Sequence, residues 1–296
     1  MTKTSNKIVF FGSGPVAAKS LALLLANFEV EAVVTKPTTK FEMQKVAKDV
    51  QVYTVSNKSE LDTLVRSQKF ESRLGVLIDF GIIVSSSVIS SFPLGIVNSH
   101  FSILPEWRGA DPINFAILSG QQETGVSLML LVEAMDEGPL LIYSTYKLPP
   151  DITSIELTQN LIHISNDMLR HTIPEYQAGR IALTDQSRTG RSVSYSRKLT
   201  KKDGVLDFNK PAEQLEREIR AFIEWPKSRT ELAGKDVVIL SASVDETQSG
   251  EIGKAYKTND KKIAVYTAKG SLIIDMLKPA GKKAMTAEAF LAGHSL

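Results

Sequence analysis

Short apolar stretches alternate with helical stretches through the first 150 residues of this chain. This alternation predicts a parallel sheet covered by helices, because consecutive parallel strands need a long crossover connection between them. The expected strands are Ile8–Phe11, Val30–Thr35, Val50–Val55, Leu74–Asp79 and Gly95–Ser99. The pattern therefore predicts a Rossmann-like, doubly wound α/β domain with a parallel sheet, in which ligands bind outside the carboxyl ends of the strands.

The pattern changes in the second half of the chain. Residues 151–180 predict a helix with a broad apolar face, which we expect to close the first domain. Residues 184–202 are rich in Ser, Thr, Arg and Lys, the composition of a linker. One amphipathic helix, residues 211–222, and several short strands follow, which predict a smaller β-barrel domain, with the OB-like barrel as one candidate. The expected strands are Val237–Ser241, Ile263–Thr267 and Ser271–Leu277. We expect a catalytic domain at 1–183, a linker at 184–202 and a barrel at 203–296.

Composition narrows the classes of function. Cysteine is absent, which excludes disulfides, thiolate catalysis and Cys-ligated metal sites. No apolar run approaches the roughly 18 residues of a membrane span, and we expect neither a signal peptide nor a membrane segment, hence a cytoplasmic protein. Residues 190–296 carry 19 Lys and Arg against 14 Asp and Glu, whereas residues 1–189 carry 16 against 19. This basic second half favours a polyanionic partner, although a solvated basic surface would look the same.

A glycine motif, Gly12-Ser13-Gly14 followed by Ala17, stands between the first expected strand and a helix over residues 15–26. It fits the G-x-G-x-x-A pattern of dinucleotide-binding proteins. The second expected strand, however, ends in Thr35-Lys36 and lacks the acidic residue that holds the ribose in such proteins. Our first hypothesis for the motif is a tight turn that needs small residues, and our second is anion binding at the helix N-terminus. A dehydrogenase is the last of our hypotheses.

Three polar residues suggest acyl-transfer chemistry. Asn98 and His100 stand two apart at the end of an expected strand, so their side chains leave the same face. An amide and a protonated imidazole are suited to stabilise an oxyanion on an acyl carbon. Asp136 lies in an acidic turn between two apolar strands, where it could hold the imidazole and raise its pKa. The alternatives are a structural His at a strand end and a turn Asp that bonds its own backbone.

Ordered motifs around these residues resemble the folate-dependent formyltransferases. They are Asn98-x-His100-x-Ser102-x-Leu104-Pro105, Arg108-Gly109-x-x-Pro112-Ile113, Gly120, Thr124-Gly125-Val126 and Asp136-x-Gly138. The resemblance implies that Asn98, His100 and Asp136 are catalytic, that 10-formyltetrahydrofolate is the co-substrate, and that no metal takes part. It also implies the folate-binding residues, which are Phe80, Gly81, Ile82, Ile83, Ser102, Ile103, Leu104, Pro105 and Gly138.

The second half resembles the branch of this family that formylates methionyl-tRNA. The similar segments are Tyr195-Ser196-Arg197-Lys198, Lys202-Asp203-Gly204, residues 215–222, Trp225-Pro226 and residues 281–293. The resemblance implies formyl transfer to the free amino group of initiator methionyl-tRNA, with Asp136 keeping His100 charged and helping to route the proton. It assigns tRNA binding to Lys36, Lys40, Arg108, Arg197, Lys198, Lys201 and Lys202. No obligate protein partner is implied.

The chain departs from that family at two places. The loop at 35–45 is short and lacks Gly and Arg, which puts discrimination of the tRNA acceptor stem in question. Asp111 stands where the family has a small apolar residue and adds negative charge beside the site. A nucleotide-sugar formyltransferase and a formyl-folate hydrolase module resemble the same first half and stay open as alternatives. So does a tRNA-binding protein without activity, for which Asn98→Ala or His100→Ala would leave function intact.

Overall fold

The computed structural model describes residues 7–296, which form two compact units. Unit 1 contains the residues up to Pro112 together with Glu123–Lys147 and Thr158–Ser196. Unit 2 contains Ile113–Gln122, Leu148–Leu157 and Arg197–Leu296. The chain therefore contributes two short excursions to unit 2 before its last hundred residues complete that unit.

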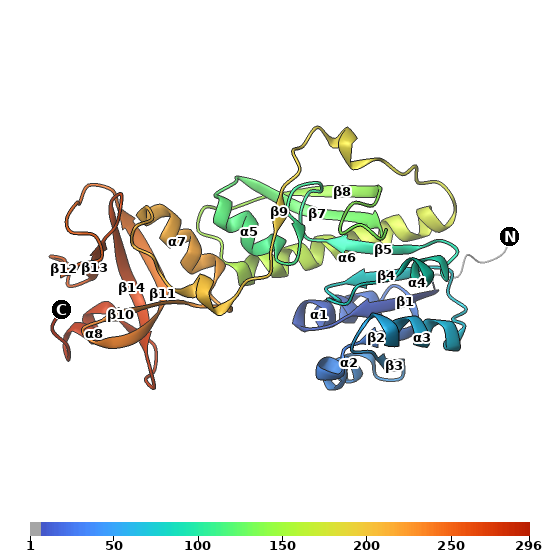
Figure 1. Cartoon of the computed structure of the whole chain (residues 1–296), viewed down its shortest axis with the longest axis horizontal. Coiled ribbons are helices and arrows are strands. Elements are labelled where there is room, and N and C mark those ends of the chain that lie inside the picture. The colour runs from blue at the N-terminus through green and yellow to red at the C-terminus, as the bar shows by residue number, and fades with distance from the viewer. Residues whose placement is uncertain (1–6) are drawn as a thin grey trace. The chain divides into compact units, whose positions relative to one another are not determined.

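Unit 1 is built on a seven-stranded sheet with the strand order β3-β2-β1-β4-β5-β7-β8 (Figure 1). The first five strands are parallel, as predicted. They are β1 (Lys7–Gly12), β2 (Glu29–Thr35), β3 (Gln51–Thr54), β4 (Gly75–Ile78) and β5 (Ile96–His100). The last two, β7 (Glu123–Leu130) and β8 (Leu140–Lys147), pair antiparallel. They are the two apolar strands expected on either side of the Asp136 turn, for which no bounds or pairing were predicted. The doubly wound α/β fold is confirmed, with a mixed rather than purely parallel sheet.

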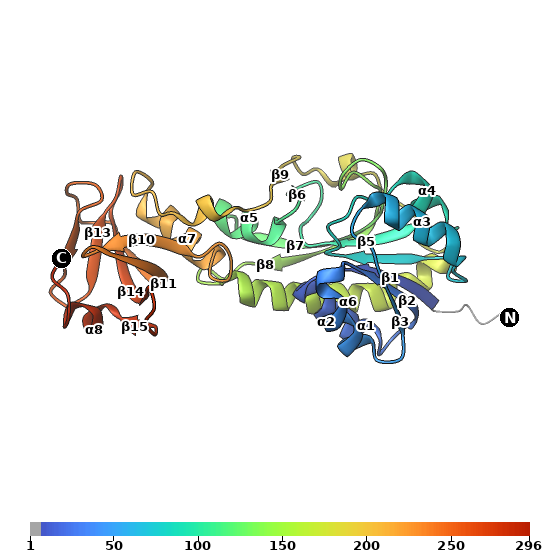
Figure 2. The ribbon, with the colours of Figure 1, turned by 60° about the horizontal axis from the view of Figure 1, so that its bottom comes forward.

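Helices cover both faces of this sheet (Figure 2). Helices α1 (Pro15–Leu24) and α2 (Lys40–Ala47) lie on one side, and α3 (Lys58–Gln68) and α4 (Ser86–Ser90) lie on the other. Phe11 of β1 packs edge-to-face against Phe80 and Phe92, with ring centroids 5.8 and 5.7 Å away. Burial of each such ring stabilises the fold by about 1.5–3 kcal/mol. This apolar layer fixes the strands whose carboxyl ends carry the polar residues discussed below.

The long helix α6 (Ser154–Gln177) is shorter than the predicted 151–180. At its start, the Glu156 carboxylate accepts hydrogen bonds from the backbone and side chain of Thr153, at 2.9 and 2.7 Å, which caps the helix. At its end, Gly179 adopts φ +72°, a left-handed conformation that stops an α-helix. Within residues 7–296, none of the helices is both long enough and apolar enough to span a membrane.

Unit 2 contains a curled antiparallel sheet of six strands, which confirms the expected second, smaller β domain. Leu215, Ile239, Leu272 and Phe290 belong to its core and are almost completely buried. Strands β10, β12 and β15 were not predicted, because β12 and β15 have only three and two residues and β10 is largely polar. The order is β10 (Ser228–Leu232), β11 (Lys235–Asp245), β14 (Ser271–Pro279), β13 (Ile263–Tyr266) and β12 (Ala255–Lys257), with β15 (Met285–Thr286) beside β14. Its helices are α5 (Pro112–Ser119, with Pro112 in unit 1), α7 (Ala212–Ala221) and α8 (Ala287–Leu291).

Residues 184–202 have the composition of a linker, yet much of this segment is held against unit 1. It contains η2 (Gln186–Thr189), β9 (Tyr195–Ser196) and the start of η3 (Lys201–Gly204). β9 pairs in parallel with β6 (Arg108–Gly109). The Arg191 guanidinium forms ion pairs with Glu106 and Glu123, at 3.0 and 2.6 Å. The pairing of β9 and the ion pairs of Arg191 therefore anchor this segment within unit 1.

Candidate active site

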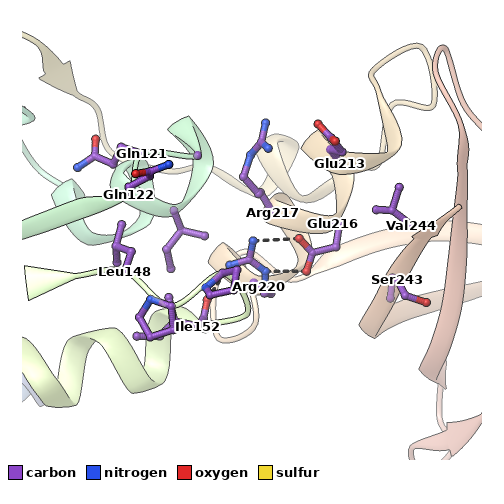
Figure 3. A pocket seen from close by; sticks show the side chains of 15 residues that line it. Gln121, Gln122, Leu148, Ile152, Glu213, Glu216, Arg217, Arg220, Ser243 and Val244 are labelled. Atoms are coloured by element: carbon purple, nitrogen blue, oxygen red, sulfur yellow. Dashed lines mark hydrogen bonds and ion pairs between the residues drawn. The ribbon is translucent and has the colours of Figure 1, made fainter. Parts of the chain in front are cut away.

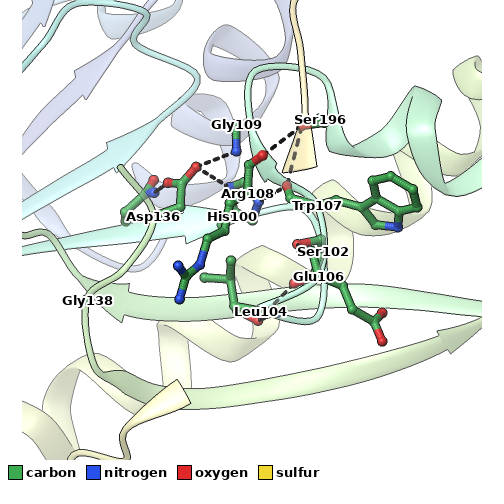
Figure 4. Close-up of polar contacts among 12 residues, drawn as sticks. His100, Ser102, Leu104, Glu106, Trp107, Arg108, Gly109, Asp136, Gly138 and Ser196 are labelled. Atoms are coloured by element: carbon green, nitrogen blue, oxygen red, sulfur yellow. Dashed lines mark hydrogen bonds and ion pairs between the residues drawn. The ribbon is translucent and has the colours of Figure 1, made fainter. Parts of the chain in front are cut away.

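The candidate site lies at the carboxyl end of β5, where the loop that carries Trp107–Gly109 meets the β7–β8 connection (Figure 4). Asn98 and His100 belong to β5 and are each only 6% exposed. Ser99, between them, bonds instead to Ser165 of α6 at 2.7 Å, on the opposite face of the sheet. The alternation of the strand thus places the amide and the imidazole side by side.

Asp136 brings the three predicted catalytic residues together. Its Oδ1 accepts a hydrogen bond from Asn98 Nδ2 at 3.4 Å, and its Oδ2 lies 3.7 Å from His100 Nδ1. The same Oδ2 accepts a 2.8 Å bond from the Gly109 backbone N–H. Asp136 has φ +54°, in the left-handed region that Asp tolerates better than most non-glycine residues. One carboxylate therefore orients the amide, the imidazole and the neighbouring loop.

The other imidazole nitrogen, His100 Nε2, lies 2.9 Å from the Trp107 carbonyl oxygen. A carbonyl only accepts hydrogen bonds, so Nε2 carries a proton in this contact. One amide hydrogen of Asn98 points to Asp136, which leaves the second for another acceptor. Asn98 and His100 are therefore both hydrogen-bond donors at this site, Asn98 toward Asp136 and His100 toward the Trp107 carbonyl.

Gln186 is a buried residue of this site that the sequence analysis missed. Its amide nitrogen donates to the backbone oxygens of Asp136 and Gly138, at 2.8 and 2.9 Å. Its amide oxygen accepts from Arg108 Nε and Nη2, at 3.2 and 2.7 Å. Gln186 therefore fixes the backbone of the residue that orients His100. A glutamine within a stretch of linker composition carries no pattern of its own, and no sequence signal pointed to it.

Arg108, one of the predicted tRNA contacts, points into this network. Besides its bonds to Gln186, its Nη1 forms an ion pair with Glu137 at 3.1 Å, and its side chain is only 11% exposed. Gly109, the next residue, has φ +119°, and a Cβ there would overlap the backbone oxygen of Ser196. The packing of β6 against β9 thus requires the glycine of the Arg108-Gly109 motif, while Arg108 bonds to Gln186 and Glu137.

The predicted folate-binding residues lie in two segments of unit 1. In the first, Ser127 Oγ donates to the Ser102 carbonyl at 2.8 Å and accepts from the Leu104 N–H at 2.9 Å, which fixes the loop. Ile103 and Leu104 are fully buried, and the Leu104–Pro105 peptide bond is cis. Gly138 also belongs to this part of the site, through its bond to Gln186.

The second segment, residues 80–83, is held by the glycine motif. Ser13 Oγ donates to the Phe80 carbonyl at 2.6 Å, and the Ser13 N–H donates to the Asp79 carbonyl at 2.9 Å. A Cβ on Gly12 would approach the ring of Phe10 to 2.6 Å, so this turn requires a glycine. Phe80 is buried, whereas Ile83 is 69% exposed. The motif therefore has the structural role that the sequence analysis placed first.

Asp79 is the most perturbed carboxyl group at this edge of the sheet. Asp79 is exposed on one side, and the protein packed against its other side removes enough water from the carboxyl group to raise its pKa from 3.8 to about 7. The positive charge of Lys36 opposes the increase, and the negative charge of Asp111 adds to it. The Lys36 ammonium lies against Gly81, where a Cβ would come within 2.7 Å of Nζ. Asp111, an unexpected residue in its motif, thus acts on Asp79.

The remaining predicted tRNA contacts are basic surface residues. Lys40 lies exposed on α2, and Arg197, Lys198, Lys201 and Lys202 lie exposed at the beginning of the last part of unit 2. Arg197 forms an ion pair with Asp203, and this pairing holds the pKa of the Asp203 carboxyl well below its usual range. The guanidinium of Arg197 also lies 5.9 Å from the centre of the Phe115 ring. Arg197 is thus fixed, while the three lysines extend into solvent.

A cavity of about 580 Å³ lies within unit 2 (Figure 3). Arg220 on its wall binds Glu216 through two bonds of 2.6 and 2.9 Å and donates to the Ile152 carbonyl. Arg217 donates to the Leu118 carbonyl at 3.2 Å. These bonds tie α7 to the two short excursions of the chain. The predicted catalytic and folate-binding residues all lie in unit 1, so none of them lines this cavity.

Comparisons with known proteins agree with these motifs. A family model described as formyl transferase matches residues 6–173, and one described as formyl transferase, C-terminal domain matches residues 198–295. The chain is 35% identical to the methionyl-tRNA formyltransferase of Myxococcus xanthus, over 98% of this chain and 96% of that one. It is 33% identical to that of Roseiflexus sp. (strain RS-1), over 98% and 93%. The fold also matches the N-formyltransferase of Helicobacter canadensis in complex with folinic acid and dTDP-3-aminofucose, with TM-score 0.68, 17% identity, and coverage of 91% and 98%.

Proposed function

The chain belongs to the formyl transferase family, and on this basis we propose that it transfers a formyl group from 10-formyltetrahydrofolate to the free amino group of initiator methionyl-tRNA. The single observation that carries the chemistry is the convergence of Asn98 and His100 on Asp136 beside the loop at 102–105. The acceptor follows from near full-length similarity to two methionyl-tRNA formyltransferases. The product is N-formylmethionyl-tRNA, the aminoacyl-tRNA of translation initiation.

In the reaction we propose, the neutral amine attacks the formyl carbon and the carbonyl oxygen becomes an oxyanion. The free amide hydrogen of Asn98 and the Nε2 hydrogen of His100 donate to this oxyanion, each contributing about 2.7–4 kcal/mol in comparable sites. Asp136 holds both donors and helps to pass the proton of the attacking amine to the departing folate nitrogen. Holding two large substrates in the reactive pose contributes further.

Two sets of residues would bind the substrates. Phe80, Gly81, Ile82 and Ile83, with Ser102, Ile103, Leu104, Pro105 and Gly138, would hold the folate. Lys36, Lys40, Arg108, Arg197, Lys198, Lys201 and Lys202 would face the tRNA, with Arg108 acting through the loop it anchors. We further propose a catalytic domain at 1–183, a linker at 184–202 and a tRNA-binding barrel at 203–296, in a cytoplasmic protein without an obligate protein partner or catalytic metal.

The test is formyl transfer from 10-formyltetrahydrofolate to charged initiator and elongator methionyl-tRNA, by the wild type and His100→Ala, at two salt concentrations. We expect transfer that prefers the initiator, weakens with salt and falls steeply in the variant. His163→Ala, which alters an exposed histidine of α6, is the matched control and should behave as wild type. Equal activity of His100→Ala and wild type would refute the proposed mechanism.

A nucleotide-sugar amine is the second candidate acceptor. It is favoured by the short segment after β2, where η1 (Pro37–Thr39) and α2 leave little length for engaging an acceptor stem. The same assay with a dTDP-amino sugar separates the two acceptors. Transfer to the sugar but to neither tRNA, with folate binding intact, would replace the tRNA by the sugar. Release of formate without any acceptor would indicate a hydrolase.

A further inference from the structure

Phe41, in the first turn of α2, is 82% exposed, the highest value among the exposed large apolar side chains of residues 7–296. Two residues along, Met43 is completely buried and anchors the same helix to unit 1. The ring is therefore presented to solvent from a firmly packed helix, where the fold itself gains nothing from its apolar surface. An exposed ring of this kind is a candidate contact for a partner.

Lysines flank Phe41 in the sequence. Lys40 precedes Phe41, Lys45 lies one helical turn further on, and both are exposed. Residues 36–48 contain four lysines and a single acid, Glu42, which gives this segment a net charge of +3. An exposed aromatic ring among positive charges complements a single-stranded nucleic acid, whose bases stack on rings and whose phosphates attract lysines.

The segment is tied to the candidate site. Lys36 follows β2 directly, and its ammonium lies against Gly81 in one of the predicted folate-binding segments. Thr39 Oγ1 bonds to Thr35 Oγ1 at 2.8 Å and donates to the Lys36 carbonyl at 3.2 Å, which fixes the turn between β2 and α2. Phe41 therefore stands five residues beyond a lysine that reaches the site, on the same carboxyl edge of the sheet.

We propose that Phe41 is a stacking platform for an unpaired base at the aminoacylated 3′ end of the tRNA, with Lys40 and Lys45 on the adjoining phosphates. The inference rests on the proposed function, because that end must lead the amino group to Asn98 and His100. It explains how a segment without arginine or glycine engages the acceptor: the ring supplies the contact, and Lys36 directs the strand toward the site.

The test compares the affinity of the full chain for two uncharged initiator tRNAs, one intact and one lacking its unpaired 3′ nucleotides. Phe41→Ala and Phe41→Leu should weaken binding of the intact tRNA by about 5- to 150-fold, the range for loss of one stacked base. Both should bind the truncated tRNA as wild type does. Phe41→Trp should keep the affinity, and its added fluorescence should be quenched by the intact tRNA alone.

Salt separates stacking from charge. Lys40→Gln and Lys45→Gln should flatten the dependence of affinity on salt, whereas Phe41→Ala should leave that slope unchanged. Ile142→Ala, which trims a half-exposed apolar side chain of β8, is the control and should match wild type on both tRNAs. Equal losses on the two tRNAs, or wild-type affinity of Phe41→Leu, would overturn the proposal. Wild-type enzyme that formylates no methionyl-tRNA would instead refute the proposed function.

Discussion

Replacement of Gln186 tests whether activity and stability depend on its hydrogen bond to the Asp136 backbone. Gln186→Leu has a similar size but removes four hydrogen bonds, two to backbone carbonyls and two from Arg108. At about 0.5–1.5 kcal/mol for each bond, the loss is about 2–6 kcal/mol, and the buried carbonyls left unpaired favour the upper half of that range. In metal sites, loss of a residue that orients a catalytic group typically lowers activity by about 10- to 100-fold, and we expect Gln186→Leu to lower kcat on the same scale.

Gln186→Glu is the sharper variant because it keeps the acceptor for Arg108. Its second oxygen, when ionised, faces the carbonyl oxygens of Asp136 and Gly138, which repel it. The Arg108 guanidinium lowers the pKa of this Glu, whereas burial and the two facing carbonyls raise it. We expect the second effect to prevail, so that the folded pKa lies above the unfolded value and the stabilising bond is lost as pH rises through the folded pKa. The variant should be closer to wild type in stability at pH 5 than at pH 8.

The assay is urea unfolding of the full chain at both pH values, followed by formyl transfer under conditions in which each variant is folded. Gln248→Leu, at an exposed position of unit 2, is the matched control and should change neither quantity. If Gln186→Leu unfolds at the wild-type urea concentration with wild-type kcat, the reasoning on Gln186 is wrong. The same holds if Gln186→Glu shows no dependence on pH beyond that of the wild type.

Three further predictions concern other parts of the molecule. Burial raises the pKa of Asp79 to about 7, so its ionised carboxylate lowers the stability of the fold, and this loss is recovered as pH falls. Because the residue is also exposed to solvent, which weakens the effect, we expect the free energy of unfolding of wild type to fall by about 1–2 kcal/mol more than that of Asp79→Asn between pH 5 and pH 8, as measured by urea unfolding. Gly109→Ala should place a Cβ on the Ser196 carbonyl, separate β6 from β9 and reduce kcat at least about 10-fold, whereas Ala110→Gly should not. Lys201→Gln with Lys202→Gln should weaken tRNA binding and reduce the slope of log Kd against log salt by about 1–2, with the KM for folate unchanged; an unchanged slope would remove these lysines from the interface.

The parallel half of the fold could be predicted because each strand leaves a local signal. Val30–Thr35 and Ile8–Phe11 are apolar runs with a helical stretch between them, and the structure has β1, α1 and β2 at these places. The antiparallel hairpin of β7 and β8 could be predicted only in part, because apolar strands were expected on both sides of the Asp136 turn but without bounds. The register of β8 depends on its pairing with β7, which no local pattern encodes.

The candidate site divides similarly. The alternation of side chains along β5 places Asn98 and His100 on one face, which can be read from their spacing. The contact of His100 with Asp136 depends on the β7–β8 connection, which carries Asp136. The order of the motifs suggested this contact, and the pairing of β7 with β5 and β8 produces it. The contact of His100 Nε2 with Trp107, and the bonds of Gln186, depend on how loops fold back in three dimensions. Such contacts leave no trace in residue spacing.

The two early excursions of the chain into unit 2 set an order in which the protein can mature during synthesis. Asn114 of α5 donates to the Ala221 carbonyl, 107 residues later, and Arg217 donates back to Leu118, 99 residues earlier. At about 5–20 residues per second, these partners leave the ribosome about 5–20 s after α5 does. Helix α5 must therefore wait beside a growing chain, and a nascent chain stalled before α7 carries unsatisfied surface for a chaperone to cover.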